Sequence, residues 1–278
     1  LNAETAGCKA LYISYASATN SATGDFVGQV KSIEFKAYDP GTKAMVSKTV
    51  ATYKYDASGY LASVTDPRSS VTTNYSYASS SLTQVKLLTN IDQSTNLAGT
   101  TYIYDSQARL FHVALDRADG NSGSEVVSTF VYNVSNGQSI LPSATAALWG
   151  QNLYPKNVSA VFGPEAPASV SSATDNIDLT TLDLNTLKLG TFYFTNSDGL
   201  VVNEASYGKS TWNYTYNQLD EQNRTIASFD QNGINQILTL NGQGLLVNYN
   251  IYRFATVNKY APATFVGDTQ VDGGQLIE

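Results

Sequence analysis

The only histidine is the first residue to weigh for chemistry, because a Ser-His-Asp or Cys-His arrangement would have to include it. His112 lies in a run, 110–115, where it alternates with apolar residues. This alternation predicts a strand with His112 on its solvent or cavity face and favours a structural role. A histidine metal site needs more than one histidine. The single cysteine, Cys8, excludes an internal disulfide and a cysteine-built zinc site.

Oxygen-rich loops are the next candidates, because carboxylate and carbonyl oxygens bind calcium. They are Asp116, Asp119, Gly120 and Asn121 in one loop, then Asp175, Asp178 and Asp183 in an acidic stretch. The EF-hand spacing fails in the first loop, since Ala118 and Gly120 occupy ligand-type positions. A long hairpin loop explains that loop better than a calcium site, so we assign no metal ligand.

Two further kinds of site can be weighed. The chain has 23 Asp and Glu residues, but no spacing singles out a pair of carboxylates for glycoside hydrolysis. Aromatic residues recur two apart and could stack sugars, although packing between neighbouring strands is the favoured interpretation. The sequence therefore assigns no catalytic, cofactor-binding or metal-binding residue, and we expect a protein that is not an enzyme.

Composition narrows the class of protein. Of 278 residues, 42% are hydrophobic and only 14% charged, and Tyr is abundant at 19. Tyr, Thr and Val suit strands, so the composition predicts an all-β protein. The net charge of −7 disfavours nucleic acid as a partner, because phosphate binding needs clustered Lys and Arg. No apolar run reaches the roughly 18 residues of a membrane span.

Local patterns support strands joined by tight turns. Residues 30–38 alternate between apolar and polar side chains, as in a strand with one solvent-exposed face. Asp39–Thr42 has the proline and glycine of a turn, and residues 45–55 read as the returning strand. Helical periodicity is almost absent. We predict serial antiparallel β-hairpins in a curved or spiralling sheet.

The series of predicted strands is interrupted once along the chain. Residues 138–190 contain four of the seven prolines and an Asp/Leu/Thr-rich stretch. We therefore predict a strand-rich lobe over 1–137, an irregular or partly helical connection over 138–190, and a second strand-rich lobe over 191–278.

An internal repeat organises the lobes: aromatic-x-aromatic, Asp or Asn, a turn, then a second strand. Copies begin near Tyr53, Tyr102, Phe192 and Trp212, and the last leads through Asn223 to Asp230–Gly233. In the first copy, period two places Tyr53 and Tyr55 on one face and Lys54 on the other. Gly59 should have a positive φ, so Gly59→Val should destabilise. Ala108 stands at the matching point of the second copy and predicts a differently shaped turn.

These units resemble the YD repeats of the RHS family, which includes teneurins and the C component of insecticidal Tc toxins. Tyr-x-Tyr-Asp-x-x-Gly-x-Leu at 53–61 and Tyr-x-Tyr-Asp-x-x-x-Arg-Leu at 102–110 carry the resemblance. Segments around Gly7-Cys8, 28–31, 66–68, 148–151, 160–162 and 167–169 are similar to segments of secreted actinobacterial RHS proteins of the polymorphic toxin type.

The resemblance implies a wall segment of a hollow shell that encloses or displays a toxic C-terminal payload. It implies a secreted or cell-surface protein, partnered by the rest of the shell and the payload in cis or in another chain. About 20 strands would cover about a quarter of the wall that a 200-residue payload needs. We therefore expect a portion of a larger shell with unpaired terminal strands.

Two other functions stay open. A surface adhesin could bind a cell-surface glycan or a partner protein, and a β-fold glycosidase is the third interpretation. A continuous polar inner wall without a pocket would favour the shell. Binding of polysaccharide would favour the adhesin. A hydrolytic activity that is lost when one carboxylate is replaced would favour the enzyme.

Overall fold

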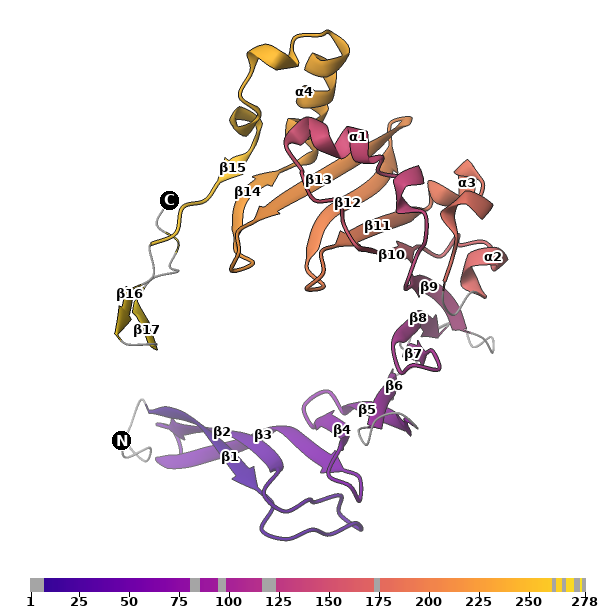
Figure 1. The fold of residues 1–278 in the computed structure, drawn as a ribbon. Coiled ribbons are helices and arrows are strands. Elements are labelled where there is room, and N and C mark those ends of the chain that lie inside the picture. The colour runs from indigo at the N-terminus through magenta and orange to yellow at the C-terminus, as the bar shows by residue number, and fades with distance from the viewer. Residues whose placement is uncertain are drawn as a thin grey trace. The chain divides into compact units, whose positions relative to one another are not determined.

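A computed structural model of the chain describes residues 8–80, 86–94, 99–116, 124–172, 176–261, 264–266, 269–272 and 276 (Figure 1). Strands β1 to β15 form one sheet in which each strand is hydrogen-bonded to the next in sequence. Every strand pair whose register is described is antiparallel. The predicted all-β fold of serial antiparallel hairpins is confirmed.

The chain divides into two compact units, residues 1–127 and 128–278. The segment 138–190, predicted as a connection, belongs to the second unit and contains a sheet strand, β10 (Asn157–Phe162), between its short helices. The division into two lobes and a connection stays a prediction.

The first unit, as far as it is described, consists of strands and loops without a helix. Its strands are β1 (Lys9–Tyr15), β2 (Val30–Asp39), β3 (Ala44–Tyr55), β4 (Leu61–Asp66), β5 (Val71–Ser79), β6 (Lys86–Gln93), β7 (Thr100–Tyr104) and β8 (Leu110–Asp116), with β9 (Ser124–Val131) running into the second unit.

The second unit combines strands with short helices. The strands are β10, β11 (Gly190–Thr195), β12 (Val201–Gly208), β13 (Thr211–Leu219), β14 (Thr225–Phe229) and β15 (Thr256–Val257). A separate hairpin pairs β16 (Thr264–Val266) with β17 (Thr269–Asp272). The α-helices are α1 (Ser143–Ala146), α2 (Ala168–Ser171), α3 (Leu184–Leu187) and α4 (Gln231–Gly242), and the 3₁₀ turns are η1 (Gly137–Ser139), η2 (Ala147–Trp149), η3 (Leu179–Thr181), η4 (Leu246–Asn248) and η5 (Ile251–Phe254).

The two faces of the first unit's sheet differ in character. One carries most of the apolar side chains, with Lys9 and Lys48 among them, and the other carries most of the hydroxyl groups, with Tyr12 and Ile103 among them. Directly paired residues share a face, and the apolar pairs are Leu11↔Phe35, Ile13↔Ile33, Tyr53↔Val64, Tyr75↔Ile91 and Tyr102↔Val113. The polar face is a row of hydroxyl side chains across β1 to β5: Ser14, Ser32, Thr52, Thr65 and Thr72. Tyr53 and Tyr55 are half-buried and Lys54 is exposed, so their predicted alternation is confirmed.

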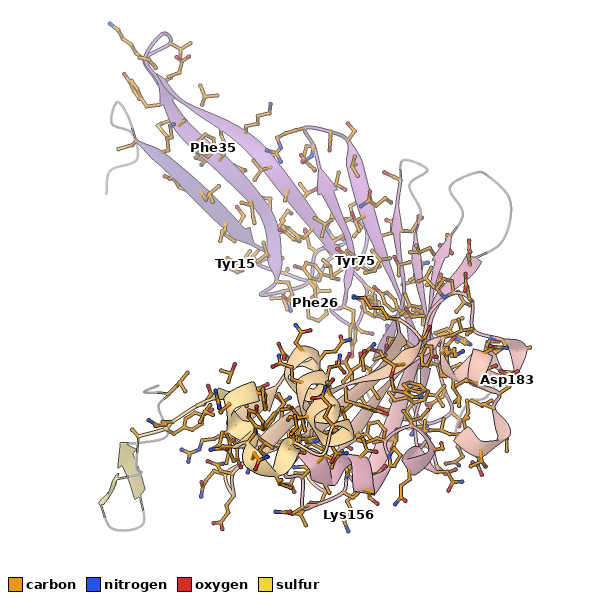
Figure 2. All side chains as sticks on the ribbon, turned by 90° about the horizontal axis from the view of Figure 1, so that it is seen from above. Tyr15, Phe26, Phe35, Tyr75, Lys156 and Asp183 are labelled. Carbon is orange, nitrogen blue, oxygen red and sulfur yellow. The ribbon has the colours of Figure 1, made fainter. Side chains whose placement is uncertain are left out.

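No described element of the first unit covers this apolar face. Leu11 is 66% exposed, Ile13 51% and Val46 50%, and Tyr15, Phe35 and Tyr75 of the same face are labelled in Figure 2. The continuous core of buried residues lies wholly in the second unit. The first unit is therefore a single layer of sheet.

In the second unit, the chain covers its own apolar sheet face. Phe162, Phe192, Phe194 and Phe229 are buried on the strands. The residues packed in the same cluster come from the helices and turns: Ile140, Leu141, Trp149, Val170, Leu187, Ile234 and Ile237. This unit has the two layers that a domain needs to enclose a core.

Helix α4 was not expected from the sequence. Asp230–Gly233 was read as part of the fourth repeat, but the Asp230 carboxylate accepts a hydrogen bond from the Gly233 N–H at 2.7 Å and caps the helix. The isoleucines at 234 and 237 are three residues apart and both are buried. A capped turn and the first turn of a helix use the same residue types, so the sequence alone did not separate them.

All four repeats close with the same turn. In the first, the Asp56 N–H donates to the Tyr60 carbonyl at 2.8 Å, and the Gly59 N–H donates to the Asp56 carbonyl at 3.0 Å. The Asp56 Oδ1 also accepts from the backbone N–H groups of Ser58 and Tyr60. The equivalent bonds form at Asp105, Asn196 and Asp220.

The prediction that Ala108 changes the turn was wrong. Ala108 has φ 60° and Asn223 has φ 62°, close to the 84° and 80° of Gly59 and Gly199. The Asp carboxylate accepts hydrogen bonds from the backbone N–H groups on either side of the fourth turn residue, and that residue is left-handed even where it is not glycine. The register also shifts six residues after each Asp or Asn, where one extra residue is inserted: Ala62, Phe111, Val202 and Ile226.

The interpretation of His112 also needs correction. His112 is 8% exposed and Ala114, on the same face, 1%, whereas Leu115 on the other face is 41% exposed. The bulge at Phe111 breaks the alternation, and β8 is buried on both faces around 111–112. The alternation of residue types along β8 therefore could not show which face of the strand is exposed to solvent.

We expect Gly59→Val to destabilise more than Gly28→Val. Both glycines have positive φ, 84° and 80°, but a Cβ at Gly59 would lie 2.9 Å from the Phe26 ring, whereas Gly28 faces open space. Gly28→Val should lower the free energy of unfolding by about 1–2 kcal/mol. Gly59→Val should lose about 1–3 kcal/mol more, through overpacking. Urea unfolding measures both, and equal losses would count against the packing of Phe26 on this turn.

We expect Ala108→Gly to stabilise the chain slightly. It relieves about 1–2 kcal/mol of left-handed strain and costs about 0.4–1 kcal/mol in unfolded-chain entropy. The net gain should be about 0.5 kcal/mol in urea unfolding. A clear loss of stability would show that the Ala108 turn is not strained.

Candidate functional site

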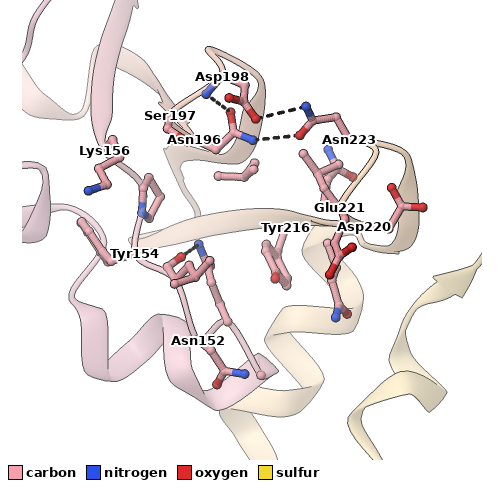
Figure 3. A pocket seen from close by; sticks show the side chains of 18 residues that line it. Asn152, Tyr154, Lys156, Asn196, Ser197, Asp198, Tyr216, Asp220, Glu221 and Asn223 are labelled. Atoms are coloured by element: carbon pink, nitrogen blue, oxygen red, sulfur yellow. Dashed lines mark hydrogen bonds between the residues drawn. The ribbon is translucent and has the colours of Figure 1, made fainter.

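A hollow in the second unit lies where two repeat turns meet the segment 150–156 (Figure 3). Its volume is about 460 Å³, and residues 150–156, 196–198 and 216–221 supply most of its lining. We call it the turn-lined pocket. It lies at the end of the sheet where β11 and β13 run into their turns.

Side chains of the two turns bind one another at the pocket wall. The Asn223 Nδ2 donates to the Asp198 Oδ2 at 3.1 Å, and the Asn196 Nδ2 donates to the Asn223 Oδ1 at 3.5 Å (Figure 3). Each turn is also closed from within by the oxygen of Asn196 or Asp220. The wall is therefore held in place before any ligand arrives.

The facing segment is fastened to the sheet by a buried amide pair. The Gln151 Nε2 donates to the Asn203 Oδ1 at 2.7 Å, and the Asn203 Nδ2 donates to the Gln151 Oε1 at 2.9 Å. The Trp149 indole N–H also donates to the Gln151 Oε1, at 3.0 Å. Gln151 is 6% exposed and Asn203 1%, so these bonds satisfy polar groups that water does not reach.

A tyrosine forms part of the lining. Burial raises the pKa of Tyr216 to about 12, so its hydroxyl stays protonated at neutral pH. The Tyr216 ring stacks on Phe229 of β14 with centroids 5.8 Å apart. The side chain is therefore positioned by the core, and it also lines the pocket.

One carboxylate of the pocket, Asp220, is held ionised by its neighbours. Burial raises the pKa of Asp220, but hydrogen bonds from Arg224 and Gln222 lower it by more, and the net pKa lies below its usual value. The Arg224 Nε lies 2.7 Å from the Asp220 Oδ2. Asp220 therefore stays ionised and bound to Arg224.

The residues singled out from the sequence lie outside this pocket. His112 is buried in β8, with its ring 3.8 Å from that of Phe111. Asp178 accepts hydrogen bonds from Asn136 and Thr180, and Asp183 caps α3. Asp116 accepts a hydrogen bond from Ser124 at 2.7 Å. Asp119, Gly120, Asn121 and Asp175 lie outside the described residues.

No group of three possible metal-binding side chains occurs within the part of the chain that the structure describes. None of its described helices is long and apolar enough to cross a membrane. The predicted packing role of the aromatics holds for Tyr216 with Phe229 and for Tyr207 with Trp212, which are direct cross-strand pairs.

The pocket was missed because its walls are far apart in sequence. The Asp and Asn turns and the run 148–151 were each visible as motifs. Nothing in the sequence indicated that Gln151 pairs with Asn203, 52 residues away.

Comparison with known proteins finds structural similarity only. No family model matches the chain, and no curated protein sequence matches it. Similar solved structures include the crystal structure of TcdB2-TccC3-Cdc42, with 12% identity and a TM-score of 0.31, and the Photorhabdus luminescens Tc holotoxin pore, with 12% identity and a TM-score of 0.30. Both alignments cover 80% of this chain and 12% of the other. The chain thus spans about an eighth of the length of these structures, and the likeness is too distant to bear on function.

We expect the buried amide pair to act as a unit. Asn203→Ala should lower the free energy of unfolding by about 2 kcal/mol, because it removes both hydrogen bonds between Asn203 and the buried Gln151 amide. Gln151→Ala together with Asn203→Ala should cost less than the sum of the single changes by about 1 kcal/mol. Asn152→Ala, at an exposed neighbouring amide, is the matched control and should change little. Additive losses in denaturant unfolding would contradict this coupling.

Proposed function

We propose that the chain is a wall segment of an RHS-type shell that encloses or displays a toxic polypeptide payload. In this role the chain is not an enzyme, and it acts outside the producing cell. The observation that carries the proposal is the single-layer sheet of the first unit, with its uncovered apolar face.

An uncovered apolar face of this kind favours contact with another polypeptide. Fully burying one side chain of the size of Leu or Ile contributes about 1.5–3 kcal/mol. Leu11, Ile13 and Val46 are at least half exposed in this chain. Contiguous exposed apolar surface marks an interaction site, and a payload lying against this face would bury it.

The terminal strands favour continuation of the wall. Among the described residues, β1 pairs only with β2, and β15 pairs only with β14. A strand at a sheet edge presents unpaired N–H and C=O groups to a further strand. The rest of the shell, in cis or in another chain, is the proposed partner at these edges.

A second function is favoured by one observation. A surface adhesin would need a site for a glycan or a partner protein, and the turn-lined pocket is a hollow of about 460 Å³ lined by both apolar and polar side chains. The sequence-based expectation for a shell alone was a continuous polar inner wall without a pocket, and neither this hollow nor the apolar face of the first unit matches that expectation. The glycosidase interpretation gains no support from the pocket, since Asp220 is ion-paired.

The wall proposal is tested with the complete reading frame that contains these residues. We expect the payload to resist limited proteolysis in the wild-type protein. Ile13→Lys with Val46→Lys should speed its digestion about fivefold, because charges on the apolar face oppose its burial. Both side chains are half exposed in the chain itself, so these changes should leave the sheet folded.

Ser14→Lys is the matched control, because Ser14 lies next to Ile13 on the opposite, polar face of β1. It should leave payload protection unchanged. Equal effects of Ser14→Lys and Ile13→Lys, or a payload digested equally fast with and without this chain, would contradict the proposal.

A further inference from the structure

We propose that two copies of this chain associate through β1, which pairs antiparallel with β1 of the second copy about a two-fold axis at Tyr12. The inference rests on the proposed function in one respect, because it names the partner at one edge of the wall. Its evidence is separate: the direction of the free backbone groups of β1, the lack of protection along this edge, and the match between β1 and a second β1.

The backbone groups of alternate residues of β1 point away from the sheet. In an antiparallel pair, a residue that exchanges hydrogen bonds with the partner strand is followed by one whose N–H and C=O point to the other side. The Tyr38 N–H donates to the Cys8 carbonyl at 3.3 Å, and Ala16 exchanges hydrogen bonds with the residues just before β2. The even-numbered residues of β1 therefore bond to β2. The residues that present N–H and C=O groups at the edge are Lys9, Leu11, Ile13 and Tyr15.

This edge lacks the usual protection against pairing. β1 is the outermost described strand on its side of the sheet, and six of its seven residues are exposed (Figure 2). Proline, inward-pointing charges and short length normally blunt an edge strand. β1 has no proline and a single charge, Lys9 at its start. Its exposed large apolar side chains are Leu11, Tyr12, Ile13 and Tyr15, so this edge favours the addition of another strand.

The opposite edge of the sheet offers less to a further strand. β15 has two residues, and the Asn258 side chain after it donates back to the Thr225 carbonyl at 2.9 Å. The Tyr260 hydroxyl donates to the same carbonyl at 3.0 Å. The proposed interface therefore uses β1 in both copies. An interface that uses the same strand twice closes after two copies, whereas β1 against β15 would continue into a filament.

β1 is complementary to itself in one register. About an axis at Tyr12, Leu11 of one copy lies opposite Ile13 of the other, so two apolar pairs flank the centre. Each pair joins residues whose N–H and C=O groups face the edge, so the two residues exchange hydrogen bonds. This register pairs the whole of β1, whereas an axis at Leu11 or at Ile13 would pair only residues 9–13 or 11–15.

Charge complementarity favours a second copy as the partner. Lys9 is the only charged residue of β1, and in this register it lies opposite Tyr15 of the other copy. A lysine over a tyrosine ring is a favourable contact. The first unit already contains one, with the Lys36 Nζ 4.1 Å from the centroid of the Tyr12 ring. No like charges meet along the paired strands.

The pairing extends the wall without turning it over. Directly opposite residues of an antiparallel pair share a face, and Leu11 and Ile13 lie on the apolar face of the first unit. The apolar faces of both copies therefore lie on the same side of one continuous sheet. In the proposed wall, a second copy supplies the further strand at β1.

The test uses the full chain with Cys8→Ala and one new cysteine, treated with a mild oxidant. Tyr12→Cys places two cysteines opposite each other at the axis, in a non-hydrogen-bonded pair with Cα atoms about 4.5 Å apart, which a disulfide can span. We expect a covalent dimer on a non-reducing gel. Ser14→Cys is the matched control on the same face of β1. Ser14 lies opposite Ala10 in this register, so the two Ser14 residues are offset by about 14 Å along the strands and should stay uncrosslinked.

Charge variants test the register without a cross-link. Leu11→Lys with Ile13→Lys places like charges opposite each other twice and should weaken dimerisation about tenfold in analytical ultracentrifugation. Leu11→Lys with Ile13→Glu is the matched control, because it changes the same positions but creates two pairs of opposite charge, and it should restore most of the affinity. Both side chains are more than half exposed within the chain, so both variants should remain folded.

Four outcomes would overturn the proposal: a chain that stays monomeric up to millimolar concentration, growth beyond a dimer, equal cross-linking by Tyr12→Cys and Ser14→Cys, or equal dimerisation of the two charge variants. The wall proposal is tested separately, by digestion of the payload in the complete reading frame. A monomeric chain with a protected payload would refute the β1 pairing alone. A dimer whose payload is unprotected would refute the wall alone.

Discussion

The structure depends on one small interaction, a side-chain oxygen that accepts two backbone N–H groups across a turn. At Asp56, Asp105, Asn196 and Asp220 this oxygen closes the same hairpin. The residue three positions after this Asp or Asn has a positive φ. The residue six positions after it is the extra residue of a β-bulge in the following strand. The turn thereby fixes the register of the strands on either side. Since a slip of one residue exchanges the two faces of a strand, everything that the sheet presents follows from this register.

The two units use that turn with opposite faces. In the first unit the apolar aromatics, such as Tyr53 and Tyr55, lie three positions and one position before the turn Asp. In the second, the buried aromatics lie an even number of positions before it, as Phe192 and Phe194 do before Asn196. One turn therefore supports an apolar face on either side of the strand. The second unit covers its apolar face with short helices and α4. In the first unit, no described residues cover the apolar face.

This difference connects structure with proposed function. A unit that covers its own apolar face encloses a core within the chain, as the second unit does. A single layer depends on something else to cover it, which is what a wall and its contents would provide for each other. The wall proposal thus draws on the first unit of the chain.

The amino-acid sequence by itself determined the all-β fold, the hairpin repeat and the position of each turn, because these depend on neighbours within about ten residues. Period two placed Tyr53 and Tyr55 on one face, and the Asp and Asn positions marked the turns. Only the tertiary structure decided which face is buried. It buried His112 on a strand whose alternation suggested solvent, since a bulge and packing on both faces override the local period. It also turned Asp230 into a helix cap and joined Gln151 to Asn203, because such contacts depend on which distant segments lie side by side.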